Sequence, residues 1–345
     1  MSEPQVVASL HAAEAPRRPQ NGPPQEGAPR QGPPLDRRRL WKAAIKWPMY
    51  AVAVMPALIA AGWRLGRGLP MRLDQLLLFL LAAVLLLAWE NLANDVFDDE
   101  TGVDTHGKPH SVVALTGRRD RVAALANGAL VLGLLVMAVV ALRSSGAVLL
   151  LVLACCGLGY LYQGPPFRLG YRGLGEPLCW LAFGPCATAA ALLALAPVAE
   201  AGGAAGAPIP WADALVLGGG PALATTLVLF CSHFHQVEED ATHGKRSPVV
   251  QLGSDRAAAL VPWFVAATLA WEWAPVLLGW WPLTALLGAI GLPPARALIR
   301  LLRDHHQVPE RISGSKFLAL RFQALNGLGL AVGLALGPWL ARAGH

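Results

Sequence analysis

Residues 76–100 read LLLFLLAAVLLLAWENLANDVFDDE and carry the clearest structural signal in the chain. The first half of this run is entirely apolar, and the second half carries amide and carboxylate side chains. With its neighbours the apolar part covers 73–94, and a helix that crosses a bilayer needs about 17 to 25 such residues. The run therefore predicts a membrane-spanning helix that ends in an acidic segment.

Apolar runs of the same kind recur along the chain. Of its 345 residues, 54% are hydrophobic and only 14% are charged, whereas a soluble domain has about 25% charged residues. We expect membrane spans at 45–63, 73–94, 121–142, 146–163, 176–198, 212–235, 258–279, 281–302 and 317–340. The run at 281–302 is the least regular, because Gly291, Pro293 and Pro294 interrupt it. The sequence predicts an all-α, multi-pass bundle of about nine transmembrane helices in the lipid bilayer.

The first 39 residues differ from the rest. They are rich in Pro, Gln, Arg and Gly with almost no apolar periodicity, a composition that cannot bury enough surface to fold. They also lack the apolar core and cleavage site of a signal peptide. We expect a disordered tail at 1–39 and a transmembrane domain at 40–345.

Most Lys and Arg residues lie in the tail and in the loops between the predicted spans. If the tail is cytoplasmic, 23 of the 28 Lys and Arg residues fall in the tail and in the second, fourth, sixth and eighth loops. Cytoplasmic loops of membrane proteins carry such an excess, so we expect these four loops on the cytoplasmic face. The net charge of +6 does not indicate a nucleic-acid partner, because it is not gathered on one face of a soluble module.

Acidic and amide side chains collect at the end of the second span. If the helix continues, one face holds positions i, i+3, i+4 and i+7, which are Asn91, Asn94, Asp95 and Asp98. Ionisable groups beside a membrane span are costly and usually mark function. Neighbouring carboxylates resist joint ionisation unless a cation neutralises them, and such oxygen ligands suit Mg²⁺.

A second polar cluster, SHFHQVEED at 232–240, ends the sixth span on the same predicted face. One continuous helix would place together Ser232, Gln236, Glu239 and Asp240. Cations follow both clusters, namely Lys108, Arg118, Arg119, Lys245 and Arg246. Mg²⁺ prefers one or two carboxylates plus substrate phosphates, and the cations would stabilise a departing diphosphate. The two clusters therefore indicate a Mg²⁺-dependent diphosphate site.

The loop after the fourth span adds aromatic groups to this face. It reads YLYQGPPFRLGYRGLGE over 160–176, where Gly and Pro favour a fixed turn. The aromatic faces of Tyr160 and Tyr162 would stabilise a carbocation.

These motifs resemble the UbiA superfamily of intramembrane prenyltransferases, and the resemblance extends over 41–340. The run at 94–98 matches the family's N-D-x-x-D motif. In the family's second motif, D-x-x-x-D, Gln236 replaces the first Asp and Asp240 keeps the second. The resemblance implies a UbiA-like helical fold.

Three further runs are similar to the family branch that prenylates 1,4-dihydroxy-2-naphthoate, and especially to its phytyl-transferring members in cyanobacteria and plastids. They are 164–175, HFHQVEED at 233–240 and GKRSP at 244–248. This likeness implies Mg²⁺-dependent transfer of a phytyl group from its diphosphate to 1,4-dihydroxy-2-naphthoate or 2-carboxy-1,4-naphthoquinone, with decarboxylation, in phylloquinone biosynthesis. It also implies a cyanobacterial plasma or thylakoid membrane as the location.

On this resemblance we assign roles to individual residues. The expected metal ligands are Asn94, Asp95, Asp98, Glu239 and Asp240. The expected catalytic residues are Asp98, Asp240, Tyr160 and Tyr162. Diphosphate binding falls to Lys108, Arg118, Lys245 and Arg246. Substrate binding falls to Asn91, Arg168, Arg172, His233 and Gln236.

Alternatives stay open within and outside this class. The spans do not reveal the length of the substrate tunnel, so the protein could be a menaquinone-type enzyme with a longer all-trans donor. It could also be a related phytyl or geranylgeranyl transferase that acts on homogentisate or chlorophyllide. A cation-coupled secondary transporter would place its ionic groups near the bilayer midplane, whereas these clusters lie at span ends.

Overall fold

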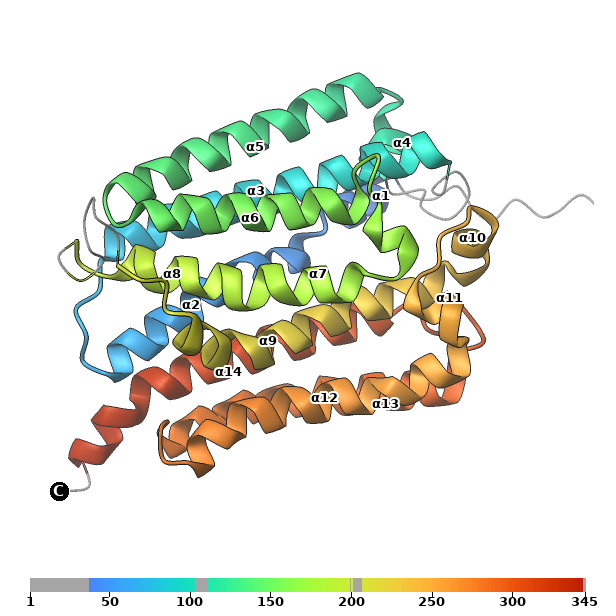
Figure 1. Ribbon diagram of the computed structural model, residues 1–345. Helices are drawn as coiled ribbons and strands as arrows, with labels where there is room; N and C mark the ends of the chain where they lie inside the picture. Colours follow the sequence, from blue (N-terminus) through green and yellow to red (C-terminus); the bar gives the residue numbers. More distant parts are fainter. Residues whose placement is uncertain (1–36, 103–110, 199, 201–206, 344–345) are drawn as a thin grey trace, which may run out of the picture. The chain divides into compact units, whose positions relative to one another are not determined.

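The computed structural model describes residues 37–102, 111–198, 200 and 207–343 of this protein. Within these residues every regular element is a helix, which confirms the all-α prediction (Figure 1). Contacts divide the chain after Asp36 into two units, and the first unit, which contains most of the expected tail, lies outside the described residues. Helix α1 (Arg37–Ile45) opens the second unit.

The described residues contain nine helical segments long and apolar enough to cross a membrane, as the sequence predicts. They are built from η1 (Trp47–Met49) and α2 (Tyr50–Gly66), α3 (Leu73–Thr101), α5 (Arg119–Leu142), α6 (Gly146–Gln163), α7 (Gly175–Leu181) with η3 (Ala182–Cys186) and α8 (Ala187–Leu195), α9 (Trp211–Ser232), α12 (Ser254–Leu277), η6 (Leu283–Gly291) with α13 (Leu292–His305), and α14 (Ser315–Ala343). Short helices connect them: α4 (Val112–Thr116), η2 (Leu169–Arg172), η5 (His233–His235), α10 (Val237–Thr242) and α11 (Pro248–Leu252).

Two spans change their helix type along the way. The fifth contains a π-helical turn, η3, in which Gly184 leaves the helical conformation with φ −95° and ψ −107°. The eighth begins as the 3₁₀ helix η6 and becomes α-helical at Leu292. Pro293 and Pro294 occupy the first turn of α13, where a missing N–H costs nothing. These prolines therefore start a helix rather than interrupt one.

The two acidic clusters lie on different local structures. Helix α3 continues through the first cluster to Thr101, as expected. The second cluster does not lie on one helix, so the expected shared face of Ser232, Gln236, Glu239 and Asp240 is wrong. Helix α9 ends at Ser232, the 3₁₀ turn η5 follows, and Gln236, with φ −130°, breaks the helix before α10 begins.

Close glycine contacts hold α14 between α2 and η6. A Cβ at Gly62 or Gly66 of α2 would lie 2.1 or 2.0 Å from a backbone oxygen of α14. A Cβ at Gly329 or Gly333 of α14 would lie 2.2 or 2.1 Å from a backbone oxygen of η6. Each pair has the G-x-x-x-G spacing that lets membrane helices approach closely. These contacts hold α14 close to α2 and to η6.

Buried hydrogen bonds connect η6 to α12 and α14. Glu272 of α12 is fully buried, and its Oε2 accepts a hydrogen bond from Asn326 Nδ2 at 2.8 Å. Asn326 Nδ2 also donates to the carbonyl of Gly288 at 3.2 Å. Glu272, to which the sequence assigned no role, thus connects α12, α14 and η6.

The polar connections gather at one end of the bundle. Figure 1 shows α4, α10 and α11 together where α3, α6, α9 and α13 end. The second, fourth, sixth and eighth loops therefore share one end, which we call the polar end.

We predict that Gly62→Leu destabilises the bundle. The new side chain collides with the Ala331 carbonyl 2.1 Å from its Cβ and separates α2 from α14, so the free energy of unfolding should fall by about 2 kcal/mol. Thermal unfolding in detergent micelles measures the change. The matched control is Gly128→Leu on α5, where a Cβ meets nothing within 4 Å. Equal melting temperatures for the two variants would contradict this account of the packing.

Candidate active site

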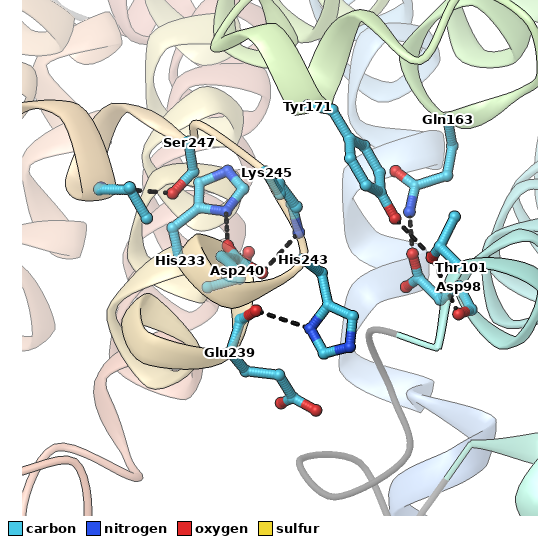
Figure 2. A network of polar contacts seen from close by, with 12 residues as sticks. Asp98, Thr101, Gln163, Tyr171, His233, Glu239, Asp240, His243, Lys245 and Ser247 are labelled. Carbon is cyan, nitrogen blue, oxygen red and sulfur yellow. Dashed lines mark hydrogen bonds and ion pairs between the residues drawn. The ribbon is translucent and has the colours of Figure 1, made fainter. Parts of the chain in front are cut away.

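Asp240 forms the centre of one polar cluster at the polar end (Figure 2). Its side chain is fully buried, and Lys245 Nζ lies 3.1 Å from its Oδ1. Gly244, with φ +73°, turns the chain so that the Lys245 backbone N–H donates to the Asp240 carbonyl at 2.8 Å. Burial raises the pKa of Asp240, but the neighbouring His233 and the charge of Lys245 outweigh burial and hold that pKa below its usual value. Asp240 is therefore an anion.

His233 lies between two carboxylates. Its Nδ1 is 3.8 Å from Asp240 Oδ2, and its Nε2 is 3.4 Å from Glu176 Oε1. The imidazole is buried, with 3% of its surface exposed. Because η5 ends the helix here, the ring turns toward the first turn of α7, which carries Glu176. His235 faces elsewhere, since its Nε2 contacts Ser315 Oγ at 3.1 Å.

Asp98 forms the centre of a second cluster, on α3. Its carboxylate is buried and accepts a hydrogen bond from Gln163 Nε2 at the end of α6. One turn later, Thr101 Oγ1 donates to the Asp98 carbonyl at 3.0 Å and lies 2.8 Å from the Tyr171 hydroxyl. Figure 2 shows Gln163 and Tyr171 reaching Asp98 and Thr101 from the same side.

Tyr171 of η2 contacts both clusters. Its hydroxyl meets Thr101 on the Asp98 side, and Lys245 Nζ of the Asp240 cluster lies 5.8 Å from its ring centroid. The Arg246 N–H also donates to the Tyr171 carbonyl at 2.8 Å. Burial raises the pKa of Tyr171 to about 12, so its hydroxyl stays protonated. Tyr171 therefore links segments that lie far apart in the sequence.

The glycines of the fourth loop make room for Tyr162. A Cβ at Gly170 or Gly175 would lie 2.6 or 2.7 Å from Tyr162 Cε2. Tyr160 points elsewhere: its hydroxyl donates to the Pro165 carbonyl at 2.6 Å and its ring is 40% exposed. Of the two tyrosines, Tyr162 is the one held inside the bundle.

Asp95 and Asp98 have different partners. Asp95 Oδ1 pairs with Lys46 Nζ at 3.1 Å, and its Oδ2 accepts the Val112 N–H at 2.9 Å. With Asn91, it lines a separate cavity of about 200 Å³ beside α1. Asp95 and Asp98 are three residues apart on α3, so their side chains leave the helix about 60° apart, and each reaches different neighbours.

The remaining expected cations are distributed around this end. Arg168 Nη2 lies 3.2 Å from Glu100 Oε2, and Arg119 also pairs with Glu100. Three cations are exposed, namely Arg118, Arg172 and Arg246. Lys108 lies outside the described residues.

The donor chemistry fits a hard cation, although no preformed cage is visible. Among the described residues, no three His, Cys, Asp or Glu side chains come together as a metal cluster. Asn94 Oδ1 is buried without a hydrogen-bond partner, and both Asp240 oxygens lack a well-oriented hydrogen bond despite the contact with Lys245. Orphaned carboxylate and amide oxygens are the ligands that Mg²⁺ accepts alongside substrate phosphates. Glu239 is half-buried on α10, and its carboxylate points away from Asp240 (Figure 2).

Several contacting residues were missed from the sequence. Gln163, Tyr171 and Glu176 all lie in the quoted loop, whose conspicuous polar residues were the available signal. Lys46 had a weaker signal, because it is a single cation at the start of the first span.

Known proteins resemble this chain in sequence and in fold. Residues 53–326 match the UbiA prenyltransferase family. The chain is 40% identical over 297 residues to the 2-carboxy-1,4-naphthoquinone phytyltransferase of Synechocystis, covering 86% of this chain and 93% of that protein. It is 38% identical over 307 residues to the chloroplastic enzyme of the same name from Arabidopsis thaliana, covering 88% and 78%.

Solved structures agree at the level of the fold. A UbiA homolog from Archaeoglobus fulgidus bound to DMAPP and Mg²⁺ matches with a TM-score of 0.54 at 17% identity, covering 86% of this chain and 99% of that one. A structure of digeranylgeranylglyceryl phosphate synthase matches with a TM-score of 0.54 at 18% identity, covering 87% and 99%. With its motifs, its helices and its relatives in agreement, this chain belongs to the UbiA prenyltransferase family.

Proposed function

We propose that this chain transfers a phytyl group from phytyl diphosphate to 1,4-dihydroxy-2-naphthoate, or to its quinone form 2-carboxy-1,4-naphthoquinone, in phylloquinone biosynthesis. The observation that carries the proposal is the 40% identity to the Synechocystis phytyltransferase, which extends over 93% of that protein. The two buried carboxylate clusters at the polar end support it, because they suit binding of a diphosphate with a metal.

Lys245 is central to the proposed diphosphate site. We propose that Asn94, Asp98 and Asp240 hold Mg²⁺, which when bound neutralises charge on the diphosphate. Lys245 is 4% exposed and held by Asp240, so its ammonium is aimed before substrate arrives. A buried ammonium of this kind stabilises negative charge on the leaving group. Both oxygens of Asp95 already have partners, so we give Asp95 the role of positioning α1 and α4.

The acceptor ring forms the new bond through the carbon that bears its carboxylate. A carbon–carbon bond forms while the bond between the allylic carbon and the diphosphate oxygen breaks. The carboxylate then leaves as carbon dioxide, and its bonding electron pair returns to the ring. Tyr162, held against Gly170 and Gly175, supplies an aromatic face toward the developing allylic cation.

Unpaired polar atoms support the proposed acceptor contacts. Arg168 Nε is buried without a hydrogen-bond partner among the described residues, and a guanidinium suits a carboxylate. Gln236 Nε2 is likewise buried and unpaired, and would donate to an acceptor oxygen. Asn91 lines the separate cavity beside α1, so we give it no contact with the acceptor. We retain His233, next to Asp240, and the exposed Arg172 as substrate-binding residues.

We also propose that the polar end faces the cytoplasm of a cyanobacterium-like cell, or the equivalent side of a thylakoid membrane. The excess of Lys and Arg in the loops at this end supports that orientation.

One prediction of the proposed function concerns the donor and the acceptor. Membranes containing the protein are given 1,4-dihydroxy-2-naphthoate, Mg²⁺ and equal amounts of phytyl, geranylgeranyl and long polyprenyl diphosphates. We expect a phytylated, decarboxylated product by mass spectrometry, and its loss when a chelator removes Mg²⁺. Preference for the long chain would move the assignment to menaquinone synthesis. No product from any donor, with either redox form of the acceptor, would refute the proposal.

Another prediction of the proposed function concerns the two carboxylate clusters. Asp98→Asn and Asp240→Asn keep the size of each side chain but remove its charge, so each should lower kcat by at least about 100-fold. The control is Asp99→Asn, which changes the exposed neighbour of Asp98 on the same helix and should leave kcat within about twofold. Thermal unfolding of all three variants verifies folding. Near wild-type turnover by Asp98→Asn or Asp240→Asn would remove that residue from the metal site.

A further inference from the structure

Three arginines form a row along the outer side of α13. Arg296, Arg300 and Arg303 follow one another at i, i+4 and i+7, about 6 Å and about 4.5 Å apart along the helix axis. All three are exposed. A different side of α13 enters the core through Ala295, Leu298 and Leu302. The row therefore points away from the bundle.

The protein itself leaves most of this charge uncompensated. Within the described part of the chain, the side chains of Arg296 and Arg300 form no hydrogen bond and no ion pair. Arg303 Nε lies 2.9 Å from Asp304 Oδ1, but these side chains are 71% and 50% exposed. Such exposed pairs are weak. The row is therefore free to bind an external anion.

Two exposed tryptophans indicate where the hydrocarbon layer lies. Trp263, on α12, is 72% exposed, and Trp280, just beyond its end, is 64% exposed. Exposed tryptophans of membrane proteins concentrate at the two interfaces. At 1.5 Å per residue, α12 extends roughly 21 Å from Trp263 to its end at Leu277, three residues before Trp280, and the typical hydrocarbon thickness is about 30 Å.

A contact between α12 and the end of α13 gives the depth of Arg296 relative to Trp263. His306, just after α13, contacts Ser254 Oγ and Asp255 Oδ1 of α12, each at 3.1 Å. Counting from this contact, Trp263 and Arg296 lie at nearly equal depth, roughly 14 Å along their helices. Arg296 therefore lies at the edge of the hydrocarbon. Arg300 and Arg303, nearer the polar end, lie in the headgroup layer.

We propose that Arg296, Arg300 and Arg303 bind the phosphate groups of anionic phospholipids in the leaflet at the polar end. A guanidinium matches a phosphate through two parallel hydrogen bonds. A zwitterionic headgroup brings its own cation toward the arginines, whereas an anionic headgroup does not, so the row favours lipids with net negative charge. The acyl chains of such a lipid lie beside the apolar part of the eighth span.

The test titrates the purified full-length chain in detergent micelles with dioleoyl phosphatidylglycerol or dioleoyl phosphatidylcholine and counts bound lipids by native mass spectrometry. We expect wild type to retain phosphatidylglycerol preferentially. The variant R296Q/R300Q should bind it roughly tenfold more weakly. Equal binding of phosphatidylglycerol by the two proteins would overturn the proposal. Release of the lipid by inorganic phosphate at equal concentration would also overturn it, because a free anion would then be the ligand.

The matched control is R67Q/R143Q, which removes the same charge at the opposite end of the bundle, where both arginines are exposed. This control should bind phosphatidylglycerol like wild type. Equal weakening by both double variants would show general charge attraction and overturn a local site. The single variant R300Q gives an independent reading of the row, with an intermediate loss expected. Equal melting temperatures of wild type and variants verify that lipid binding alone has changed.

Discussion

A carboxylate buried at a membrane surface needs compensating charge, and Asp240 obtains it from Lys245. This requirement explains the local chain path. A continuous helix from α9 would carry Asp240 along the axis and away from His233. The break at Gln236 and the turn at Gly244 instead fold α10 back, so that Lys245 returns to the carboxylate. The irregular backbone therefore brings Lys245 to the buried carboxylate of Asp240.

The fourth loop makes one site out of two clusters. Asp98 and Asp240 lie on α3 and α10, and each has partners of its own. Tyr171 joins them, because its hydroxyl meets Thr101 and its ring lies beside Lys245. The glycines that flank it accommodate the ring of Tyr162 beneath the loop. A substrate bound between the clusters would therefore contact a loop whose shape depends on both.

The spans were predictable because each is a long apolar run, and the continuation of α3 to Thr101 followed from the spacing of its motif. The break at Gln236 was not predictable, since residues 232–240 contain neither Gly nor Pro, the two residues that disfavour a helix most strongly. The pairing of Asp95 with Lys46 joins residues 49 apart in the sequence, and such contacts arise only from tertiary packing. Sequence spacing thus identified which residues gather at the polar end but not which of them pair.

The lengths of the helices explain why this chemistry lies at a surface rather than at the midplane. Helix α3 has 29 residues and is therefore roughly 43 Å long, which exceeds a hydrocarbon layer of about 30 Å. Its acidic end must then lie in the headgroup layer. A prenyl diphosphate has the same division, because its chain stays in hydrocarbon and its charged group stays at the surface. Under the proposed function, carboxylates at helix ends would meet the diphosphate at this depth, and the charged group of the substrate would not have to enter the apolar interior.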